Sequence, residues 1–369
     1  MKAALLLCLV FICQYTRGYL DPERNSDAPN GNNVFIITLD GLRWQEVFNG
    51  ADSTLLNNPQ FTSNIAALKQ QFWHADVQER RKKLMPFVWN TIAGQGQLFG
   101  NRAYHNQVDV SNIYRLSYPG YNEILTGKPD LKIFSNDRKV NRNKTLLEYL
   151  NTTPAYAGKV AAFASWNLFS YILNEKRSNL YINCSADEAS NPKQWSQGKA
   201  KTAKVSPRFY DEGKNTRNDW LTFAKAQQYI VQHLPKVVYV GLGGTDEYAH
   251  QKKYGQYLQQ AHQADNMIAA LWHLVQSIPY YKYNTTFIIT TDHGRGNKQS
   301  TWHKHGFLTK GSSQTWLALL GHGIAALGEH RQDGQLYQRQ LAGTIGSLLG
   351  VRSFRSEAIP ASFYAVAGR

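Results

Sequence analysis

Short runs of consecutive apolar residues, rich in β-branched side chains, recur along the chain and alternate with segments of helical spacing. The runs lie at residues 34–39, 159–165, 237–241, 285–291 and 315–320. The helical segments lie at residues 59–72, 144–150, 218–233, 257–276 and 335–349. A short uninterrupted apolar run is typical of a strand buried on both faces. Alternation of such strands with helices favours an α/β fold. The pattern therefore predicts a three-layer α/β/α sandwich around a mostly parallel central sheet.

The first eighteen residues have the pattern of a secretory signal peptide. Lys2 supplies a positive start, residues 3–13 are apolar, and a polar exit leads to Gly18. This run is shorter than the roughly 20 apolar residues of a spanning helix, and no later stretch of the sequence is apolar enough to span a membrane. A buried first helix is the alternative interpretation. We predict a signal peptide at residues 1–18 and a secreted or periplasmic protein.

The rest of the chain is predicted to form one domain. Residues 19–32 are polar and contain Pro22, Pro29 and Gly31, which predicts a flexible leader. Residues 33–369 contain the strand and helix patterns without a repeat or a clear linker. Within them, residues 183–216 are polar and lack periodicity. This segment is interpreted as an insertion or lid over the site, with a surface loop as the alternative.

The net charge narrows the class of ligand only slightly, and the cysteine content bears on disulfides. The formal net charge is +15, and it is near +13 once Lys2 and Arg17 leave with the signal. A basic surface attracts anions such as phosphate esters, sulfated glycans and nucleic acids. No aromatic–basic nucleic-acid motif stands out, and a merely solubilising surface is the alternative. Cys184 is the single cysteine after the signal, so we expect a buried structural thiol and no internal disulfide.

Acidic and imidazole side chains follow three of the predicted strands. Asp40 follows the first strand, Asp246 and His250 follow the strand at 237–241, and Asp292 and His293 follow the strand at 285–291. Parallel α/β sheets place ligands at the carboxyl ends of their strands, so these groups meet if the strands are neighbours. An aspartate after a strand can also be a helix N-cap, and residues four apart can be a surface pair. The coincidence at three strand ends favours a shared site.

Carboxylate and imidazole ligands indicate divalent metal ions. This set fits zinc, and oxygen-rich variants accept manganese, calcium or magnesium. Two ions about 4 Å apart can clamp the attacking and leaving oxygens of an in-line displacement. Such a site needs roughly six or seven ligands at about three for each ion, which is one or two more than the strand ends supply. One of His303 and His305 can complete the set.

A serine is the remaining candidate residue of the predicted site. Pro119 and Gly127 bracket a short predicted helix, and Ser117 is expected just before its N-terminus. Backbone N–H groups and the helix dipole favour negative charge at such a position. A metal could stabilise the serine alkoxide there, facing a phosphoryl group. The alternative is that Ser117 is only an N-cap.

These motifs together resemble the alkaline phosphatase superfamily, and within it the nucleotide pyrophosphatase/phosphodiesterase-type branch. The resemblance covers residues 34 to 306 in order and in rough spacing. It rests on Asp40-Gly41, the segment from Ser117 to Gly127, the pair Asp246 and His250, the triplet Asp292-His293-Gly294, and His305-Gly306.

The resemblance implies an alkaline phosphatase-like catalytic domain and a division of metal ligands. One ion would be held by Asp246, His250 and His305. The other would be held by Asp40, Asp292, His293 and the Ser117 oxygen. His305 is preferred to His303 because the matching family histidine precedes a glycine. Ser117 would be the nucleophile that forms a phosphoserine, and Asn136 would donate to the phosphoryl oxygens.

The implied activity is a secreted, metal-dependent hydrolase of anionic phosphoesters, either monoesters or diesters. Monoesterases add Arg or Lys near the phosphate, with Lys132, Arg138 and Arg177 as candidates. Tyr121 occupies the position where formylglycine sulfatases need Arg, so that class is disfavoured. A phosphotransferase or mutase with the same site is one alternative. A non-catalytic phospholigand-binding protein is the other.

Overall fold

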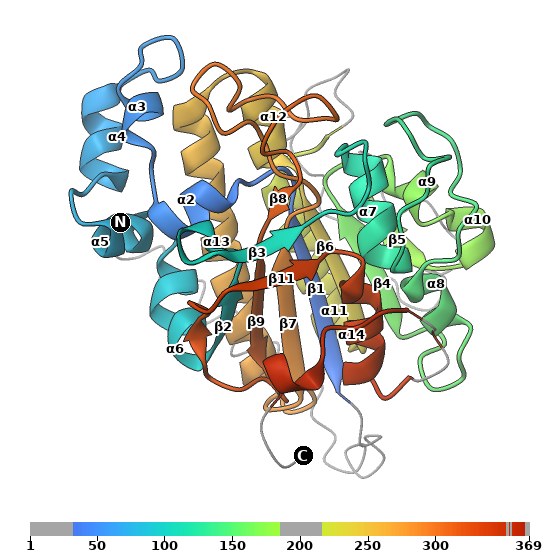
Figure 1. Ribbon diagram of the computed structural model, residues 1–369. Helices are drawn as coiled ribbons and strands as arrows, with labels where there is room; N and C mark the ends of the chain where they lie inside the picture. The colour runs from blue at the N-terminus through green and yellow to red at the C-terminus, as the bar shows by residue number, and fades with distance from the viewer. Residues whose placement is uncertain (1–31, 185–215, 352–353, 355, 366–369) are drawn as a thin grey trace. The chain divides into compact units, whose positions relative to one another are not determined.

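The central feature of the fold is an eight-stranded mixed sheet with β1 (Asn33–Leu39) in its interior (Figure 1). The computed structural model describes residues 32–184, 216–351, 354 and 356–365. The strand order is β10-β2-β9-β7-β1-β6-β4-β5. The strands other than β1 are β2 (Gly96–Phe99), β4 (Val160–Ala164), β5 (Tyr181–Asn183), β6 (Val237–Leu242), β7 (Thr285–Thr290), β9 (Leu317–Gly321) and β10 (Gly328–Glu329).

Parallel pairing joins the strands that carry the candidate site. β1 is parallel to β6 and β7, and β6, β4 and β5 continue in the same direction. β9 is antiparallel to β7, and β2 is antiparallel to β9. A smaller sheet has the order β11-β3-β8 and contains β3 (Asn106–Asp109), β8 (Gln314–Thr315) and β11 (Gly334–Tyr337). The predicted α/β fold with a mostly parallel central sheet is therefore confirmed.

Apolar side chains of β1 alternate between two cores, one on each face of the sheet. Phe35 and Ile37 pack with one group of helices, and Val34 and Ile36 pack with the other. The first group comprises α2 (Trp44–Asn49), α3 (Ser53–Leu56), α4 (Ile65–Phe72), α5 (Val77–Leu84), α11 (Asp219–His233), α12 (Gly244–His250) and α13 (Tyr254–Ser277). The second comprises α7 (Ser117–Thr126), α8 (Leu146–Asn151), α9 (Phe169–Ile172) and α14 (Gln340–Leu348).

The remaining helical elements of the described residues are short turns. They are the π-helical turn η3 (Val88–Ile92), α6 (Ala93–Gln95), η4 (Arg102–Tyr104), α10 (Glu175–Ser178) and η7 (Ala361–Phe363). Within the described part of the chain, no helix has both the length and the apolar character that crossing a membrane requires. Cys184 is buried as expected, and burial raises the pKa of its thiol to about 11.

Three element predictions need correction. The helical spacing at 335–349 is wrong at its start, because residues 334–337 form β11 and the helix begins at Gln340. The predicted helix at 59–72 is helical only from Ile65. The run at 315–320 is divided between β8 and β9, which belong to different sheets. In the first and third cases pairing with a distant strand decided the conformation. In the second case local turns at Phe61 and Thr62 and the positive φ of Asn64 precede the helix. The predicted signal peptide, the leader except for its last residue and the body of the predicted lid lie outside the described residues.

Strand register places the candidate residues at one level. Leu39 at the end of β1 is opposite Leu242 of β6, and Thr38 is opposite Thr290 of β7. The three strands therefore end together, and the segments that follow them share one edge of the sheet.

Candidate active site

The carboxyl edge of the sheet brings together the acidic and imidazole residues singled out in the sequence. They form two groups of three, and in each group the possible ligand atoms all lie within 4.8 Å of one another. One group is Asp40, Asp292 and His293; the other is Asp246, His250 and His305. The composition of both groups is the one that the family resemblance implies.

The group that follows β1 and β7 is buried, and two of its carboxylate oxygens have no proton donor. His293 Nε2 lies 3.5 Å from Asp40 Oδ1 and 3.6 Å from Asp292 Oδ2. Neither of these two oxygens has a hydrogen-bond partner among the described residues. His293 Nδ1 lies 2.9 Å from the carbonyl of Gly294, which can only accept, so Nδ1 carries the proton and Nε2 the lone pair. Buried, unpartnered acceptors facing one another are costly unless a cation lies between them, and this donor set fits a divalent metal.

The electrostatics of this group show the same need for a cation. Burial, with repulsion from Asp292 as the next cause, raises the pKa of Asp40 to about 7. Burial also raises the pKa of Asp292 to about 7, although the Gly41 N–H donates to it. Burial lowers the pKa of His293, which keeps the ring neutral and able to coordinate.

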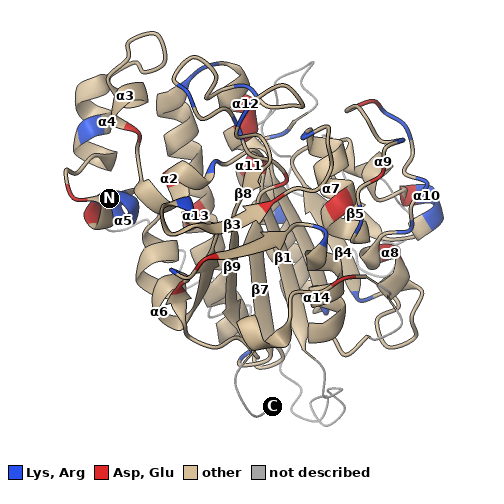
Figure 2. Cartoon of the chain, in the orientation of Figure 1, with Lys and Arg blue, Asp and Glu red and all other residues tan. Residues whose placement is uncertain are grey.

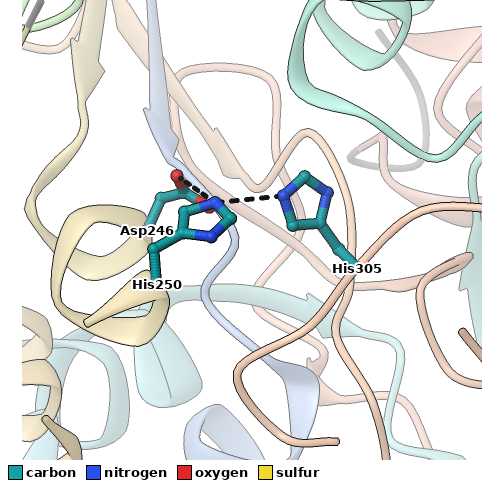
Figure 3. Close-up of side chains that lie close together, drawn as sticks. All are labelled: Asp246, His250 and His305. Carbon is teal, nitrogen blue, oxygen red and sulfur yellow. Dashed lines mark hydrogen bonds and ion pairs between the residues drawn. The ribbon is translucent and has the colours of Figure 1, made fainter. Parts of the chain in front are cut away.

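The second group is more open to solvent than the first. Its three side chains lie close together (Figure 3). His250 Nε2 lies 3.2 Å from Asp246 Oδ2 and 3.1 Å from His305 Nε2. His305 Nδ1 donates to the carbonyl of Arg115 at 3.2 Å, which directs its Nε2 lone pair toward His250. The His293 and His305 rings stack with centroids 3.9 Å apart, so the two groups are adjacent. Two ions held here would be neighbours.

The structure brings His305, and not His303, to the second group. His303 Nδ1 is buried without a partner, and its ring packs near Phe61 and Trp302. The carbonyl of His303 instead accepts a hydrogen bond from Arg295. The glycine after His305 has a φ of +106°, which lets the chain turn away directly behind the ring.

Ser117 lies beside the buried group. It is the first residue of α7, one position further into the helix than expected, and Leu116 is the N-cap. The Ser117 side chain makes no capping hydrogen bond; its Oγ lies 3.3 Å from His293 Nε2. Gly120 makes this placement possible, because a Cβ there would lie 2.3 Å from the Asp292 carbonyl oxygen. The helix is therefore pressed against the metal-ligand segment, with the serine hydroxyl at the contact.

The side chain of Asn136 is held next to the serine by a hydrogen bond from the backbone of Tyr118. Its Oδ1 accepts a hydrogen bond from the Tyr118 N–H at 3.0 Å. Because Oδ1 is occupied in this way, the Nδ2 group is the end of the amide that can donate to a ligand. The residue is exposed, on a loop that also carries Lys132 and Arg138.

Arg177 is not near a free anion site, because its guanidinium is already used. It pairs with Glu148 through two hydrogen bonds of 2.7 and 2.8 Å. It also donates to the carbonyls of Asn141, Arg142 and Asn143. These contacts make Arg177 a structural residue that joins α8 and α10 to the loop before α8.

Two residues with close contacts to the ligand groups were not assigned a role from the sequence. Tyr121 is buried, and its hydroxyl donates to Asp40 Oδ2 at 2.9 Å. Arg295 is buried and donates to Asp246 Oδ1, to the Gly41 carbonyl at 3.0 Å and to the His303 carbonyl at 2.7 Å. One guanidinium thus joins the four segments that carry the ligands. Its position directly after Asp292-His293-Gly294 was the only signal in the sequence.

Gly41 is needed for this arrangement. Its φ is +58°, and a Cβ there would lie 2.7 Å from Arg295 Nη2. Its N–H also donates to Asp292 Oδ1 at 3.1 Å. A side chain at this position would displace the guanidinium and strain the backbone.

Comparisons with known proteins establish the fold. No protein-family model and no curated protein matches the chain. The lipoteichoic acid synthase LtaP from Listeria monocytogenes aligns with 92% of this chain and 77% of its own, with a TM-score of 0.58 and 11% identity. A structure of Ps i-CgsB in complex with k-i-k-neocarrahexaose aligns with 90% of this chain and 76% of its own, with a TM-score of 0.56 and 14% identity. The 2-O GAG sulfatase BT1596 aligns with 90% and 74%, with a TM-score of 0.54 and 12% identity.

At these identities the likeness concerns the fold alone. The chain has the α/β fold with a mostly parallel central sheet that these three structures share. The nucleotide pyrophosphatase/phosphodiesterase branch is not among them, and that assignment stays a prediction from the motifs.

Proposed function

We propose that this chain is a secreted or periplasmic two-metal phosphoester hydrolase with Ser117 as its nucleophile. The observation that supports it best is the convergence of Asp40 Oδ1 and Asp292 Oδ2, neither of which has a donor, with His293 Nε2 beside the Ser117 hydroxyl. A structural role would leave two buried carboxylate oxygens without compensation. A metal ligand set with an adjacent nucleophile accounts for both of them.

Each group of three would hold one ion. Asp40, Asp292, His293 and the Ser117 oxygen would hold the first, and Asp246, His250 and His305 the second. Zinc is the first choice for this mixture of carboxylate and imidazole, with manganese, calcium and magnesium as alternatives. When bound, the ions would supply Lewis-acid stabilisation of the oxygens on either side of the phosphorus.

The residues of the chain would then act in two displacements. Ser117 Oγ attacks phosphorus in line, the bond to the alcohol oxygen breaks, and a phosphoserine forms. Water attacks the phosphoserine in the second step and releases phosphate, which restores the hydroxyl. Asn136 Nδ2 would hold an equatorial phosphoryl oxygen, where charge must be offset in a loose transition state.

Sulfate-ester hydrolysis is the second candidate, because BT1596 with the same fold is a sulfatase. A formylglycine mechanism is disfavoured by Tyr121, which stands at the position of the required Arg and is engaged with Asp40. Phosphoryl transfer to another alcohol would use the same serine with a different acceptor in place of water. A non-catalytic phospholigand-binding role would need no nucleophile.

The test is turnover of p-nitrophenyl phosphate, bis-p-nitrophenyl phosphate and p-nitrophenyl sulfate with each divalent metal, for the wild type and for Ser117→Ala. We expect the variant to retain its metal content and to lose at least roughly a thousandfold in turnover. Ser63→Ala, at an exposed loop position, is the matched control.

Three results would separate the candidates. Equal phosphatase turnover in wild type and Ser117→Ala, at equal metal content, would remove the serine from the mechanism. Turnover of the sulfate alone would favour the second candidate. Tight phosphate binding without turnover of any ester would favour the binding protein.

A further inference from the structure

Exposed apolar side chains are concentrated on the loops around Ser117. The described residues contain thirteen exposed large hydrophobic side chains, and six of them lie on three loops next to the site. We call five of these the apolar rim: Ile113, Leu131, Phe134, Phe307 and Leu308. Their exposed fractions run from 47% for Ile113 to 92% for Leu308. Scattered single residues of this kind are ordinary, but a concentration at one place indicates a binding surface.

Hydrogen bonds and a ring contact show that the three loops meet at the nucleophile. The Tyr114 hydroxyl donates to the Leu131 carbonyl at 2.8 Å, and the Tyr114 ring lies 6.4 Å from the Phe134 ring. Arg115 Nη1 donates to the Phe307 carbonyl at 3.3 Å, and the Arg115 carbonyl accepts from His305. Each loop also carries a residue of the site: the first runs into Ser117, and the others carry Asn136 and His305. The three loops that carry the apolar rim therefore meet beside Ser117.

Basic side chains lie among the apolar ones. The same loops carry Arg115, Lys132, Arg138, Lys139, Lys304 and Lys310, and Figure 2 shows basic residues on these loops. Their acidic members are already engaged: Asp137 pairs with Lys139 at 3.0 Å, and Asp130 accepts from Asn143 at 2.7 Å. Lys139 Nζ lies 5.3 Å from the Phe134 ring centroid. A surface that combines exposed apolar side chains with cations complements a ligand that has both an anionic and an apolar part.

We infer that the apolar rim binds the leaving group, and that the substrates of this site are phosphoesters of apolar alcohols, such as long-chain alkyl or lipid-derived alcohols. The inference rests on the proposed phosphoester hydrolysis and specifies its substrate class. The anionic phosphoryl group goes to Ser117 and the metal-ligand groups, while the alcohol carbon chain lies against the rim. The P–O bond to this alcohol breaks, and the alcohol leaves with a proton taken from solvent.

The test is a series of n-alkyl phosphates from methyl to octyl, with phosphate release as the measure. The alcohols differ little in reactivity, so the slope of kcat/KM with chain length reports contact with the rim. Burial of one methylene stabilises by about 0.8 kcal/mol, so each added methylene is expected to raise kcat/KM roughly three- to fourfold until the rim is covered. In Phe134→Ser, Phe307→Ser and Leu308→Ser the octyl-to-methyl ratio is expected to fall.

Tyr283→Ser is the matched control, since Tyr283 is 74% exposed but precedes β7 at the opposite end of the strand from the site. It is expected to keep the wild-type slope. Alkylphosphonates, whose P–C bond this chemistry does not cleave, make the test independent of turnover when their affinity is measured by calorimetry. Affinity that rises with chain length, in a protein that turns over no ester, would support the rim and contradict the proposed hydrolysis.

Other results would contradict the inference that the apolar rim binds the leaving group. A flat slope in the wild type, for both phosphates and phosphonates, would show that the leaving group does not contact it. An unchanged slope of kcat/KM with chain length in Phe134→Ser, Phe307→Ser and Leu308→Ser would have the same meaning. Binding to lipid vesicles without any dependence of turnover on chain length would make these side chains a membrane contact and not a substrate site.

Discussion

Replacing Asp292 by Asn should have opposite effects on the metal-free and the metal-loaded protein. Asp292 Oδ1 accepts from the Gly41 N–H, and an asparagine oxygen can keep that hydrogen bond. Asp292 Oδ2 has no donor and lies near His293 Nε2, 3.6 Å away. Asn Nδ2 would place an N–H group among these lone pairs. Without a metal the substitution therefore removes a buried charge and adds a missing donor.

The magnitude follows from the pKa of Asp292, which burial raises from 3.8 to about 7. A carboxyl whose pKa is higher in the folded state stabilises the fold most below its unfolded pKa, and loses that contribution as the pH rises through the folded value. Between pH 5 and pH 8 the loss is about 3 kcal/mol. Metal-free Asp292→Asn has no such loss, so its stability relative to wild type should rise by that amount over this window.

Comparison of the two proteins removes the contributions of buried groups that do not interact with Asp292. Asp40 adds to the difference in the same direction, because repulsion from Asp292 is one cause of its raised pKa. Burial lowers the pKa of His293 and His305, whose contributions are present above pH 6.5 and are lost as the pH falls. These contributions oppose that of Asp292, but they are common to both proteins and cancel in the difference. Asp265 also has its pKa raised by burial to about 7, and it accepts from the Phe87 and Val88 N–H groups away from the site. It cancels in the same way.

The assay is urea unfolding of wild type and Asp292→Asn at several pH values, first after treatment with EDTA and then with added zinc. With zinc the order should reverse, since the wild type gains the binding free energy and the variant has lost a ligand. Asp265→Asn is the control, and its effect should be the same with and without zinc. A difference between wild type and Asp292→Asn that has the same sign in both states would refute the metal site.

Three further variants test the contacts around the ligands. Tyr121→Phe removes the donor to Asp40 and should weaken metal binding roughly 10- to 100-fold, as measured by competition with a chelating dye; unchanged affinity would make the hydroxyl irrelevant. Arg295→Met leaves Asp246 and two carbonyls without their donor and should cost about 3–5 kcal/mol in urea unfolding, whereas a loss below 1 kcal/mol would show that the guanidinium does not join the segments. Arg177→Ala should lower the melting temperature by breaking the pair with Glu148 but leave the KM for a phosphomonoester unchanged; a raised KM would return Arg177 to the substrate site.

The sequence was most informative where local pattern and topology agree. Five apolar runs predicted strands, and strands are present at all of them because a continuous apolar run can be buried on both faces only inside a covered sheet. The same reasoning predicted which residues would meet. Asp40 and Asp292 each follow a parallel strand, and parallel strands with matched register end at one edge.

Other features depended on pairing that the sequence pattern does not encode. Residues 334–337 read as part of a helix, yet they form β11 because β3 offers a parallel edge there. His303 and His305 are chemically equivalent in the sequence, and only the path of the loop past Arg115 turned the second of them toward His250. Ser117 lies beside His293 because Gly120 lets α7 approach the Asp292 backbone.

The amino-acid sequence by itself determined the layered α/β architecture and the set of residues able to hold ions, because both follow from hydrophobic periodicity and the order of motifs. The tertiary structure alone decided that Asp40 Oδ1 and Asp292 Oδ2 face each other without a donor. It also decided that the Arg295 guanidinium contacts Asp246. Those outcomes depend on distances between segments far apart in the chain. Arg295 belongs to one of these segments and contacts the other three, and no local sequence pattern predicts this.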